Sequence, residues 1–291
     1  MGWHIENDDI WYSIDGIKLH LGKGHKLPEY QKKFAFYDRF LPFFVKAYVS
    51  SGGALVDVGA NVGDTLAALI NRTKARFICI EPNSTFYELL LENIHNMPEE
   101  ARNRIQTYQA FCSQKMNENY GMVGHDGTAH KISISSESGI PSVTLPYLLN
   151  QMQVSLQDIE LIKVDTDGFD YEVILGMEGS LIDISPVLFW ENVLDIMEID
   201  SDQTYSGYTQ LSRYLPRQGY NRFFIFDNYG VYLGEGDASF YQDINEYLHC
   251  LCLYDTAKTF FYVDVLACKD KNVAKVREIV REYRSCKWMS G

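Results

Sequence analysis

The sequence predicts an α/β fold built on a doubly wound, mostly parallel sheet, and three observations support this prediction. Short apolar runs alternate with helical patterns between residues 54 and 192. A turn with two glycines follows the first of these runs, and an acidic residue ends the second. Strands that alternate with helices form parallel sheets with right-handed crossovers, and continuously apolar strands suit a sheet covered on both faces.

The first 50 residues are expected to form an appendage packed on the main domain, which comprises residues 51–291. An alternation of polarity surrounds Asp15 and Gly16, a dipeptide that favours the type I′ turn of a β-hairpin. Aromatic residues then recur at helical intervals on both sides of Pro42. Because proline disrupts the interior of a helix, Pro42 predicts a break between two helices.

The main domain is expected to alternate strands and helices, with interruptions at 113–145 and 193–207, which we interpret as loops beside the acceptor. The final two predicted strands are candidates for an antiparallel pair at a sheet edge. The predicted elements in order are strand 54–58, helix 64–71, strand 76–81, helix 85–96, strand 105–111, strand 161–165, helix 170–177, strand 186–191, helix 208–218, strand 220–226, helix 240–254, strand 260–268 and a charged C-terminal helix.

Composition argues against several classes of protein. The formal net charge of -13 would repel a phosphate backbone, so no nucleic-acid partner is expected. The most apolar early run, which begins at Phe40, is interrupted by Pro42 and Lys46 and is too short to span a bilayer. The six cysteines lack the spacing of a zinc site, which is typical of free thiols in a reducing compartment. These features predict a cytoplasmic protein with no membrane span, and they are compatible with a homo-oligomer.

The turn after the first predicted strand is the first candidate binding site. Its two glycines, Gly59 and Gly63, flank Asn61, which replaces the second glycine of a dinucleotide-binding loop. That glycine normally lets the backbone approach a pyrophosphate, and Asp64 adds a negative charge nearby. A ligand without phosphates therefore fits better, and S-adenosylmethionine is such a ligand.

Two acidic residues suit the two ends of S-adenosylmethionine. Asp57, at the end of the first strand, can face the ammonium of the cofactor, while Gly59 allows a close approach. Glu81 ends the next strand at about the offset of ~20 residues that is expected for a ribose-binding acid. A tight turn with a purely structural role is the alternative for the glycine pattern.

A second cluster of polar residues follows in the sequence LIKVDTDG. Lys163, Asp165 and Asp167 are spaced by two, so they project toward one face at the carboxyl end of a strand if that strand continues. The next predicted strand ends at Glu191 and Asn192. We therefore expect several acidic groups to converge beside the cofactor.

Three motifs together resemble the FkbM-type family of S-adenosylmethionine-dependent methyltransferases: VDVGANVGDT (56–65), CIEPNSTFYELLLENI (79–94) and IKVDTDGFDYEVILGM (162–177). The family usually has a glutamate at the position of Asp167. The resemblance implies a Rossmann-like class I methyltransferase fold. It also implies methyl transfer to a hydroxyl of a sugar, of a polysaccharide precursor, or of a glycosylated or polyketide-type natural product.

The resemblance also implies roles for individual residues. Asp165 would lie beside the methionine end of the cofactor, and Lys163, Asp167 and Glu191 would lie near the acceptor, which is a small molecule or a saccharide. The residues that would hold the cofactor are Asp57, Gly59, Asn61, Gly63 and Glu81.

The candidate catalytic residues are Asp165, Asp167 and Lys163, because a sugar hydroxyl needs a base or a bound cation to lose its proton. Each has alternatives. Asp167 and Asp170 also resemble a helix N-cap and a first-turn acid, and Lys163 could form a buried ion pair.

A divalent metal is a separate hypothesis. Asp165, Glu191 and Asn192 offer oxygen ligands at the ends of adjacent strands, and such ligands suit magnesium rather than zinc. This arrangement is similar to that of catechol O-methyltransferase-like enzymes.

The sequence thus predicts an S-adenosylmethionine-dependent O-methyltransferase with magnesium as a candidate second cofactor. One alternative is an NAD-dependent oxidoreductase, against which Asn61 and Asp64 argue. The other is a methyltransferase-like module that binds a ligand without catalysis.

Overall fold

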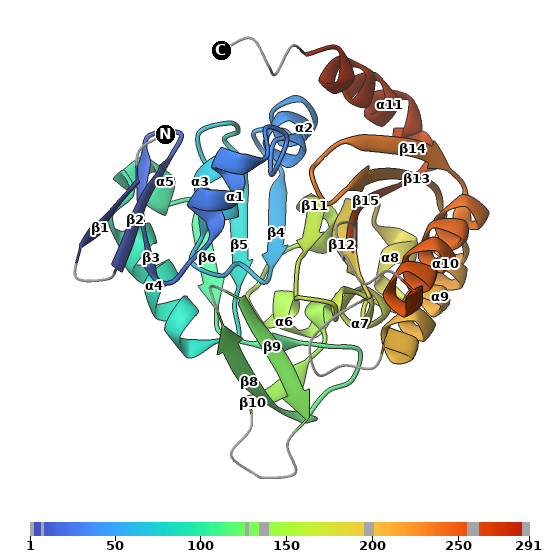
Figure 1. Cartoon of the computed structure of the whole chain (residues 1–291), viewed down its shortest axis with the longest axis horizontal. Coiled ribbons are helices and arrows are strands. Elements are labelled where there is room, and N and C mark those ends of the chain that lie inside the picture. Colours follow the sequence, from blue (N-terminus) through green and yellow to red (C-terminus); the bar gives the residue numbers. More distant parts are fainter. Residues whose placement is uncertain are drawn as a thin grey trace.

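The structure is a computed structural model, and it describes residues 3–6, 9–125, 128–133, 140–194, 201–254 and 262–286. An eight-stranded sheet forms its centre (Figure 1). Five neighbouring strands are parallel, so the prediction of a mostly parallel sheet is confirmed. In spatial order the strands are β14 (Tyr232–Gly236), β13 (Tyr220–Asp227), β15 (Tyr262–Lys269), β12 (Val187–Val193), β11 (Ile159–Val164), β4 (Ala54–Val58), β5 (Arg76–Ile80) and β6 (Ile105–Tyr108).

The last strands pair differently from the predicted edge hairpin. β15 is antiparallel to β13, as expected, but it also pairs with β12 and so lies inside the sheet. The edge is taken by β14, a strand that the sequence did not predict. Its glycines at 234 and 236 and its short length hide the usual strand pattern.

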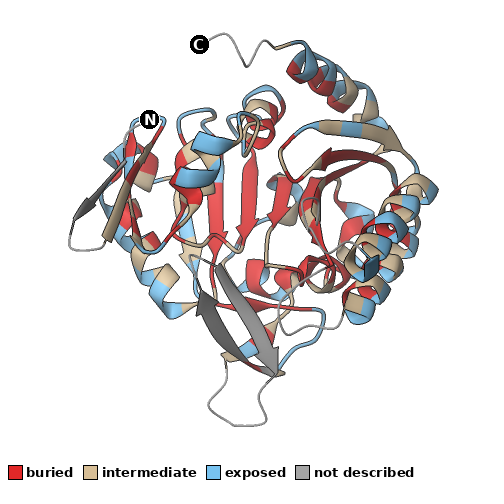
Figure 2. Ribbon diagram, viewed as in Figure 1, coloured by how far each residue is buried: buried red, intermediate tan, exposed pale blue. Residues whose placement is uncertain are grey.

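Helices cover both faces of the sheet, and the strands between them are largely buried (Figure 2). Alternate residues of β4 show the division, because Leu55 belongs to one hydrophobic cluster while Ala54, Val56 and Val58 belong to the other. The first cluster includes α2 (Phe40–Tyr48), α3 (Asp64–Leu69), α4 (Ser84–His95), α5 (Glu99–Arg102) and α11 (Asp270–Ser285). The second includes α6 (Leu145–Gln151), α7 (Asp170–Leu175), α8 (Ser180–Asp183), α9 (Ser201–Arg217) and α10 (Ala238–Tyr254).

The chain begins with a small antiparallel sheet of β1 (Trp3–Glu6), β2 (Asp9–Ile14) and β3 (Ile17–Lys23). Asp15 and Gly16 have φ angles of 47° and 82°, so the predicted hairpin turn with two left-handed residues is confirmed. The sheet packs on α4, where the Asn93 side chain accepts a hydrogen bond from the His20 N–H at 2.7 Å.

The prediction of a helix break at Pro42 is wrong. α1 (Leu27–Lys33) and α2 are separated by residues 34–39, and Pro42 is the third residue of α2. The first N–H groups of a helix have no partner within it, so proline is tolerated there.

Part of the chain expected to be a loop at 113–145 is instead extended. It contributes strands to a second sheet in the order β7-β10-β8-β9. The strands are β7 (Phe111–Cys112), β8 (Asn119–His125), β9 (Thr128–Ser133) and β10 (Ile140–Val143).

The other predicted loop, 193–207, is partly helical, because α9 begins at Ser201. Residues 195–200 lie outside the described part of the chain. A short helical turn, η1 (Leu156–Asp158), precedes β11. Among the described helices, none is long and apolar enough to cross a bilayer.

Candidate active site

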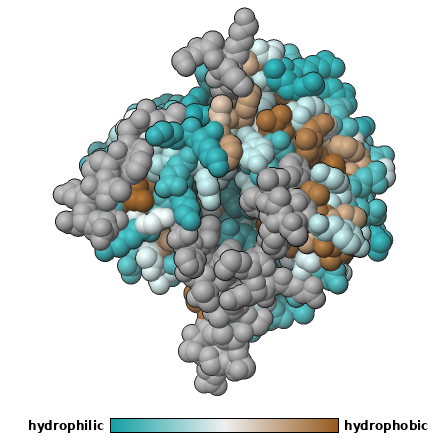
Figure 3. All heavy atoms as spheres, in the orientation of Figure 1, coloured by the Kyte–Doolittle hydropathy of each residue, from teal (hydrophilic) through white to brown (hydrophobic). Residues whose placement is uncertain are grey.

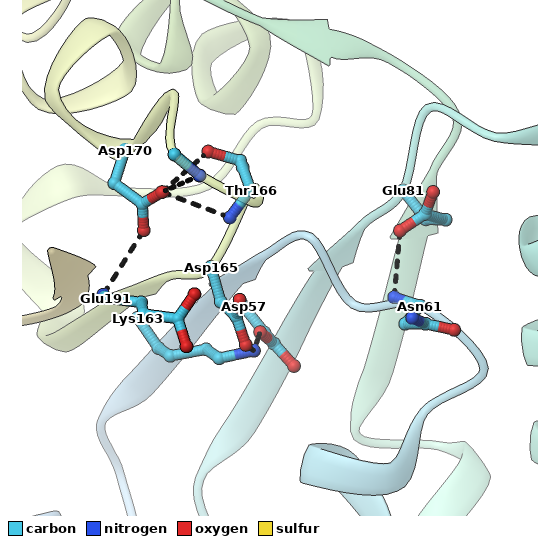
Figure 4. Close-up of polar contacts among 9 residues, drawn as sticks. Asp57, Asn61, Glu81, Lys163, Asp165, Thr166, Asp170 and Glu191 are labelled. Carbon is cyan, nitrogen blue, oxygen red and sulfur yellow. Dashed lines mark hydrogen bonds and ion pairs between the residues drawn. The ribbon is translucent and has the colours of Figure 1, made fainter. Parts of the chain in front are cut away.

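The parallel strands β4, β5, β11 and β12 end at the same edge of the sheet, and the predicted site residues gather there (Figure 4). The face drawn in Figure 3 is hollowed near its centre, where the visible side chains are hydrophilic.

Gly59 is required by the protein's own backbone. Its φ angle is +81°, and a Cβ there would lie 1.8 Å from the carbonyl oxygen of Asp165. The N–H groups of Gly59 and Ala60 donate to the carbonyl oxygen of Ile80 at 2.9 and 3.0 Å. The turn thus packs closely between the ends of β5 and β11. From the sequence, we expected Gly59 to allow the close approach of a ligand, whereas in the structure it allows the close approach of the protein's own backbone.

Gly63 serves packing of α3 on α4. It is the N-cap of α3 with a φ of +87°, and a Cβ there would lie 2.8 Å from Leu90 Cδ1.

Glu81 shapes the glycine turn. Its two carboxylate oxygens accept hydrogen bonds at 2.8 Å from the backbone N–H groups of Asn61 and Asn83. Asn61 adopts a left-handed φ of 48°, a conformation that asparagine tolerates better than most residues. Glu81 is only 4% exposed, and burial raises its pKa to about 7, although the two backbone hydrogen bonds oppose this shift.

Lys163 forms a buried ion pair, which was the alternative left open for it. Its Nζ lies 3.0 Å from Asp57 Oδ1 and 3.2 Å from Asp165 Oδ2. Burial lowers the pKa of the lysine, but the charges of Asp165 and Asp57 outweigh burial and raise it well above its usual range. Lys163 therefore stays protonated, and its amine is not available as a base.

Asp57 is as deeply buried as its partner. It is 1% exposed, and burial raises its pKa to about 6, with Lys163 acting against that shift. Its negative charge is therefore engaged within the protein. Asp165 differs, because 45% of its side chain is exposed at the edge of the sheet.

Three carboxylates converge at this edge. One oxygen from each of Asp165, Asp167 and Glu191 lies within 4.8 Å of the other two. Burial raises the pKa of Glu191 well above its usual value, and the charges of Asp165 and Asp264 add to this shift. This separation is small enough for one cation to contact all three groups.

Asn192 does not join the three carboxylates, so its prediction as a metal ligand is wrong. Its side chain is buried, and its Oδ1 accepts a hydrogen bond from the Tyr241 hydroxyl at 2.6 Å. Neighbouring residues of a strand point to opposite faces, so Glu191 and Asn192 cannot serve the same site from β12.

The loop between β11 and α7 is held by Asp170. This buried carboxylate accepts hydrogen bonds from Thr166 N–H, Thr166 Oγ1 and Gly168 N–H, and on its other oxygen from the N–H of Glu191. Asp167 has a left-handed φ of 51° and is not the N-cap, which is Phe169. The cap alternative for Asp167 is therefore wrong, whereas Asp170 is indeed a first-turn acid.

Two further acidic residues at this edge were not predicted. Asp264 pairs across the sheet with Glu191, and its pKa is raised well above its usual range by burial and then by Asp38 and Asp165. Asp264 interrupts an otherwise apolar strand, and this pattern could have marked it as a candidate site residue. Asp38 comes from the segment between α1 and α2, and no local pattern marks it.

A curated relative, the hexuronic acid methyltransferase AglP of Haloferax volcanii, is 28% identical over 136 residues, or 46% of this chain and 54% of the relative. The chain thus spans about half the length of that relative.

Solved structures of similar fold include an O-methyltransferase from Bacillus cereus in complex with SAH (12% identity, 79% of each chain, TM-score 0.45). Another is Methyltransferase FkbM from Methylobacillus flagellatus KT (14% identity, 83% of this chain and 58% of that one, TM-score 0.38). The family model of the methyltransferase FkbM domain matches residues 57–222, which is more than half of the sequence. The chain therefore belongs to the FkbM methyltransferase family.

Proposed function

We propose that this protein is an S-adenosylmethionine-dependent O-methyltransferase whose acceptor is a hydroxyl of a saccharide or of a glycosylated or polyketide-type natural product. The observation that carries the proposal is the glycine turn tied to Glu81, with the carboxylates of Asp165, Asp167 and Glu191 at the same edge of the sheet. The family supports methyl transfer, and the name of the Haloferax relative supports a sugar acid among the acceptors to be tested.

The described residues fit the parts of this cofactor. We infer that Glu81 in its ionised form accepts hydrogen bonds from the ribose hydroxyls, since each carboxylate oxygen can accept more than its one backbone hydrogen bond. Asp165, which is exposed, suits the positively charged methionine end. Asp57 and Lys163 act indirectly. Lys163 is held by its ion pair with Asp57, and it forms a second ion pair with Asp165 that fixes the position of that carboxylate.

The cofactor supplies an electrophilic methyl group, and the protein must align the acceptor oxygen and remove its proton. Alignment is worth roughly 7 to 11 kcal/mol where the geometry is good. A general base adds about 100- to 10,000-fold. Asp165 and Asp167 are our candidate bases because Lys163 is held as a cation.

Magnesium is a second proposed cofactor, with Asp165, Asp167 and Glu191 as its ligands. The fit rests on two observations. One oxygen from each of the three carboxylates lies within 4.8 Å of the other two, and the pKa of Glu191 is raised, so that an added positive charge would lower it. A bound cation would also favour ionisation of the acceptor hydroxyl. If dialysis against EDTA leaves the methylation rate unchanged, the metal has no role and a carboxylate base remains.

The decisive test of the function begins with ligand binding. S-adenosylhomocysteine at 100 times its Kd should stabilise the fold by about 2.7 kcal/mol and raise the melting temperature, whereas NAD should not. Stabilisation by NAD alone would overturn the proposal in favour of an oxidoreductase.

Transfer of a labelled methyl group then separates an enzyme from a binding module. The acceptor panel should include neutral hexoses, hexuronic acids and their glycosides. Binding of S-adenosylhomocysteine without turnover on any saccharide would argue against saccharide methylation.

A further inference from the structure

The segment between α1 and α2, residues 34–39, lies at the edge of the sheet that carries the site. α2 ends at Tyr48, and Ser50 then donates its N–H to Glu160 Oε2 at 2.7 Å, beside the start of β11. β4 begins shortly afterwards, so α2 runs back along the sheet against the direction of β4. The beginning of α2, and the segment before it, therefore lie where β4 and β11 end.

Contacts with the far side of the sheet fix the same segment. The Phe34 ring lies 4.7 Å from that of Tyr229, and a Cβ on Gly230 would lie 2.3 Å from the Phe36 carbonyl oxygen. Tyr229 and Gly230 belong to the turn after β13, which runs in the same direction as β12 because both are antiparallel to β15. Two independent parts of the fold thus place residues 34–39 at the carboxyl ends of the strands.

Asp38 is the acidic residue that this segment presents. It has a left-handed φ of 55°, and its carboxylate accepts a hydrogen bond from Gln31 Nε2 at 3.3 Å. Although Asp38 reaches the surface, the surrounding protein and then the charge of Asp64 raise its pKa to about 7. Asp165 adds to this shift and Lys163 opposes it, so both charges lie near Asp38.

The cofactor ammonium needs an accessible negative charge. Asp57 was expected to provide it, but that carboxylate is 1% exposed and already paired with Lys163. Asp165 has 45% of its side chain exposed, Asp38 is also exposed, and the charge of Asp165 adds to the raised pKa of Asp38. We propose that Asp38 binds the ammonium of the S-adenosylmethionine amino-acid end together with Asp165, so that a segment outside the matched residues 57–222 completes the cofactor site.

This inference rests on the proposed function, and two ligands separate the two ideas. S-adenosylhomocysteine carries the amino-acid end, whereas 5′-methylthioadenosine has the same nucleoside without it. Isothermal titration with Asp38→Asn should show a roughly 10- to 100-fold loss of affinity for S-adenosylhomocysteine, as expected for a hydrogen bond to a charged group. Affinity for 5′-methylthioadenosine should stay unchanged.

Two further variants serve as controls. Glu29→Gln removes an exposed carboxylate of α1 and should leave both affinities unchanged. Glu81→Gln should weaken both ligands because both contain the ribose. Asp165→Asn should resemble Asp38→Asn, and the double variant should lose less than the product of the two single losses because both groups share one ammonium.

The outcomes distinguish the inference from the function. Unchanged S-adenosylhomocysteine affinity in Asp38→Asn, or an equal loss for both ligands, would overturn the role of Asp38 while leaving the proposed function intact. Failure of the wild-type protein to bind either ligand would overturn the function itself, and the inference with it. A melting curve of each variant without ligand checks that the fold is retained.

Discussion

Replacing Gly59 with alanine tests the closest contact in the site. A Cβ at this position would meet the carbonyl oxygen of Asp165 at 1.8 Å and its carbonyl carbon at 2.8 Å, and the φ of +81° is unfavourable for alanine. Both neighbours are backbone atoms, so no side-chain rotation can relieve the clash. The end of β11 must move away from the turn, and Asp165 must move with it.

The cost has two parts. The left-handed conformation costs alanine about 1 to 2 kcal/mol, and forcing an extra methyl into a packed site costs roughly 1 to 3 kcal/mol more. The sum of about 2 to 5 kcal/mol corresponds to a fall in melting temperature of roughly 4 to 10 °C for a chain of this size. Affinity for S-adenosylhomocysteine should fall as well, because the turn and Asp165 are displaced.

Two other glycines separate these contributions. Gly179 has a φ of +81° with no atom within 4 Å of a Cβ, so Gly179→Ala isolates the conformational cost. Gly52 has neither constraint, and Gly52→Ala should change the melting temperature little. Thermal unfolding followed by circular dichroism ranks the three variants. If Gly59→Ala is no less stable than Gly179→Ala, the close approach of the turn to Asp165 is refuted.

Three other predictions concern the charged residues. Lys163→Met leaves Asp57 buried and unpaired, so it should lower the free energy of unfolding by about 3 to 5 kcal/mol in urea titrations, and adding Asp57→Asn should recover part of the loss. Because burial raises the pKa of Glu81 from 4.5 to about 7, the folded state holds a proton that the unfolded chain releases, and stability falls as pH rises through that window. Glu81→Gln should flatten this dependence in melts at several pH values, and an unaltered slope would contradict the assignment. Asp167→Asn should lower kcat about 100-fold or more while calorimetry shows unchanged affinity for S-adenosylhomocysteine, and full activity would exclude Asp167 as the base.

Sequence patterns predicted the features of this protein that depend on local order. The alternation of strands and helices gave the parallel sheet, and the offset between Gly59 and Glu81 placed the acid beside the turn. Adjacent parallel strands end at one edge, so this inference needed no knowledge of distant contacts. The alternation of side chains along a strand could also have shown that Asn192 is not a metal ligand together with Glu191, because neighbouring residues point to opposite faces of the sheet.

Other features depend on contacts between distant parts of the chain. Asp38 reaches the site only because α2 runs back along the sheet and the turn after β13 supports the segment before it. The ion pair of Asp57 with Lys163 joins residues from neighbouring strands, and Lys163 also pairs with Asp165. No local pattern encodes either relation.

The position of β15 inside the sheet limits where this chain can be divided. β15 pairs with β12 on one side and β13 on the other, yet it comes from residues 262–269, beyond the matched family segment. A fragment that stops at residue 222 would lose the strand that joins these two, and it would expose the hydrogen-bonding edge of β12. Such an edge is a template for aggregation, so we expect the isolated fragment to associate rather than fold.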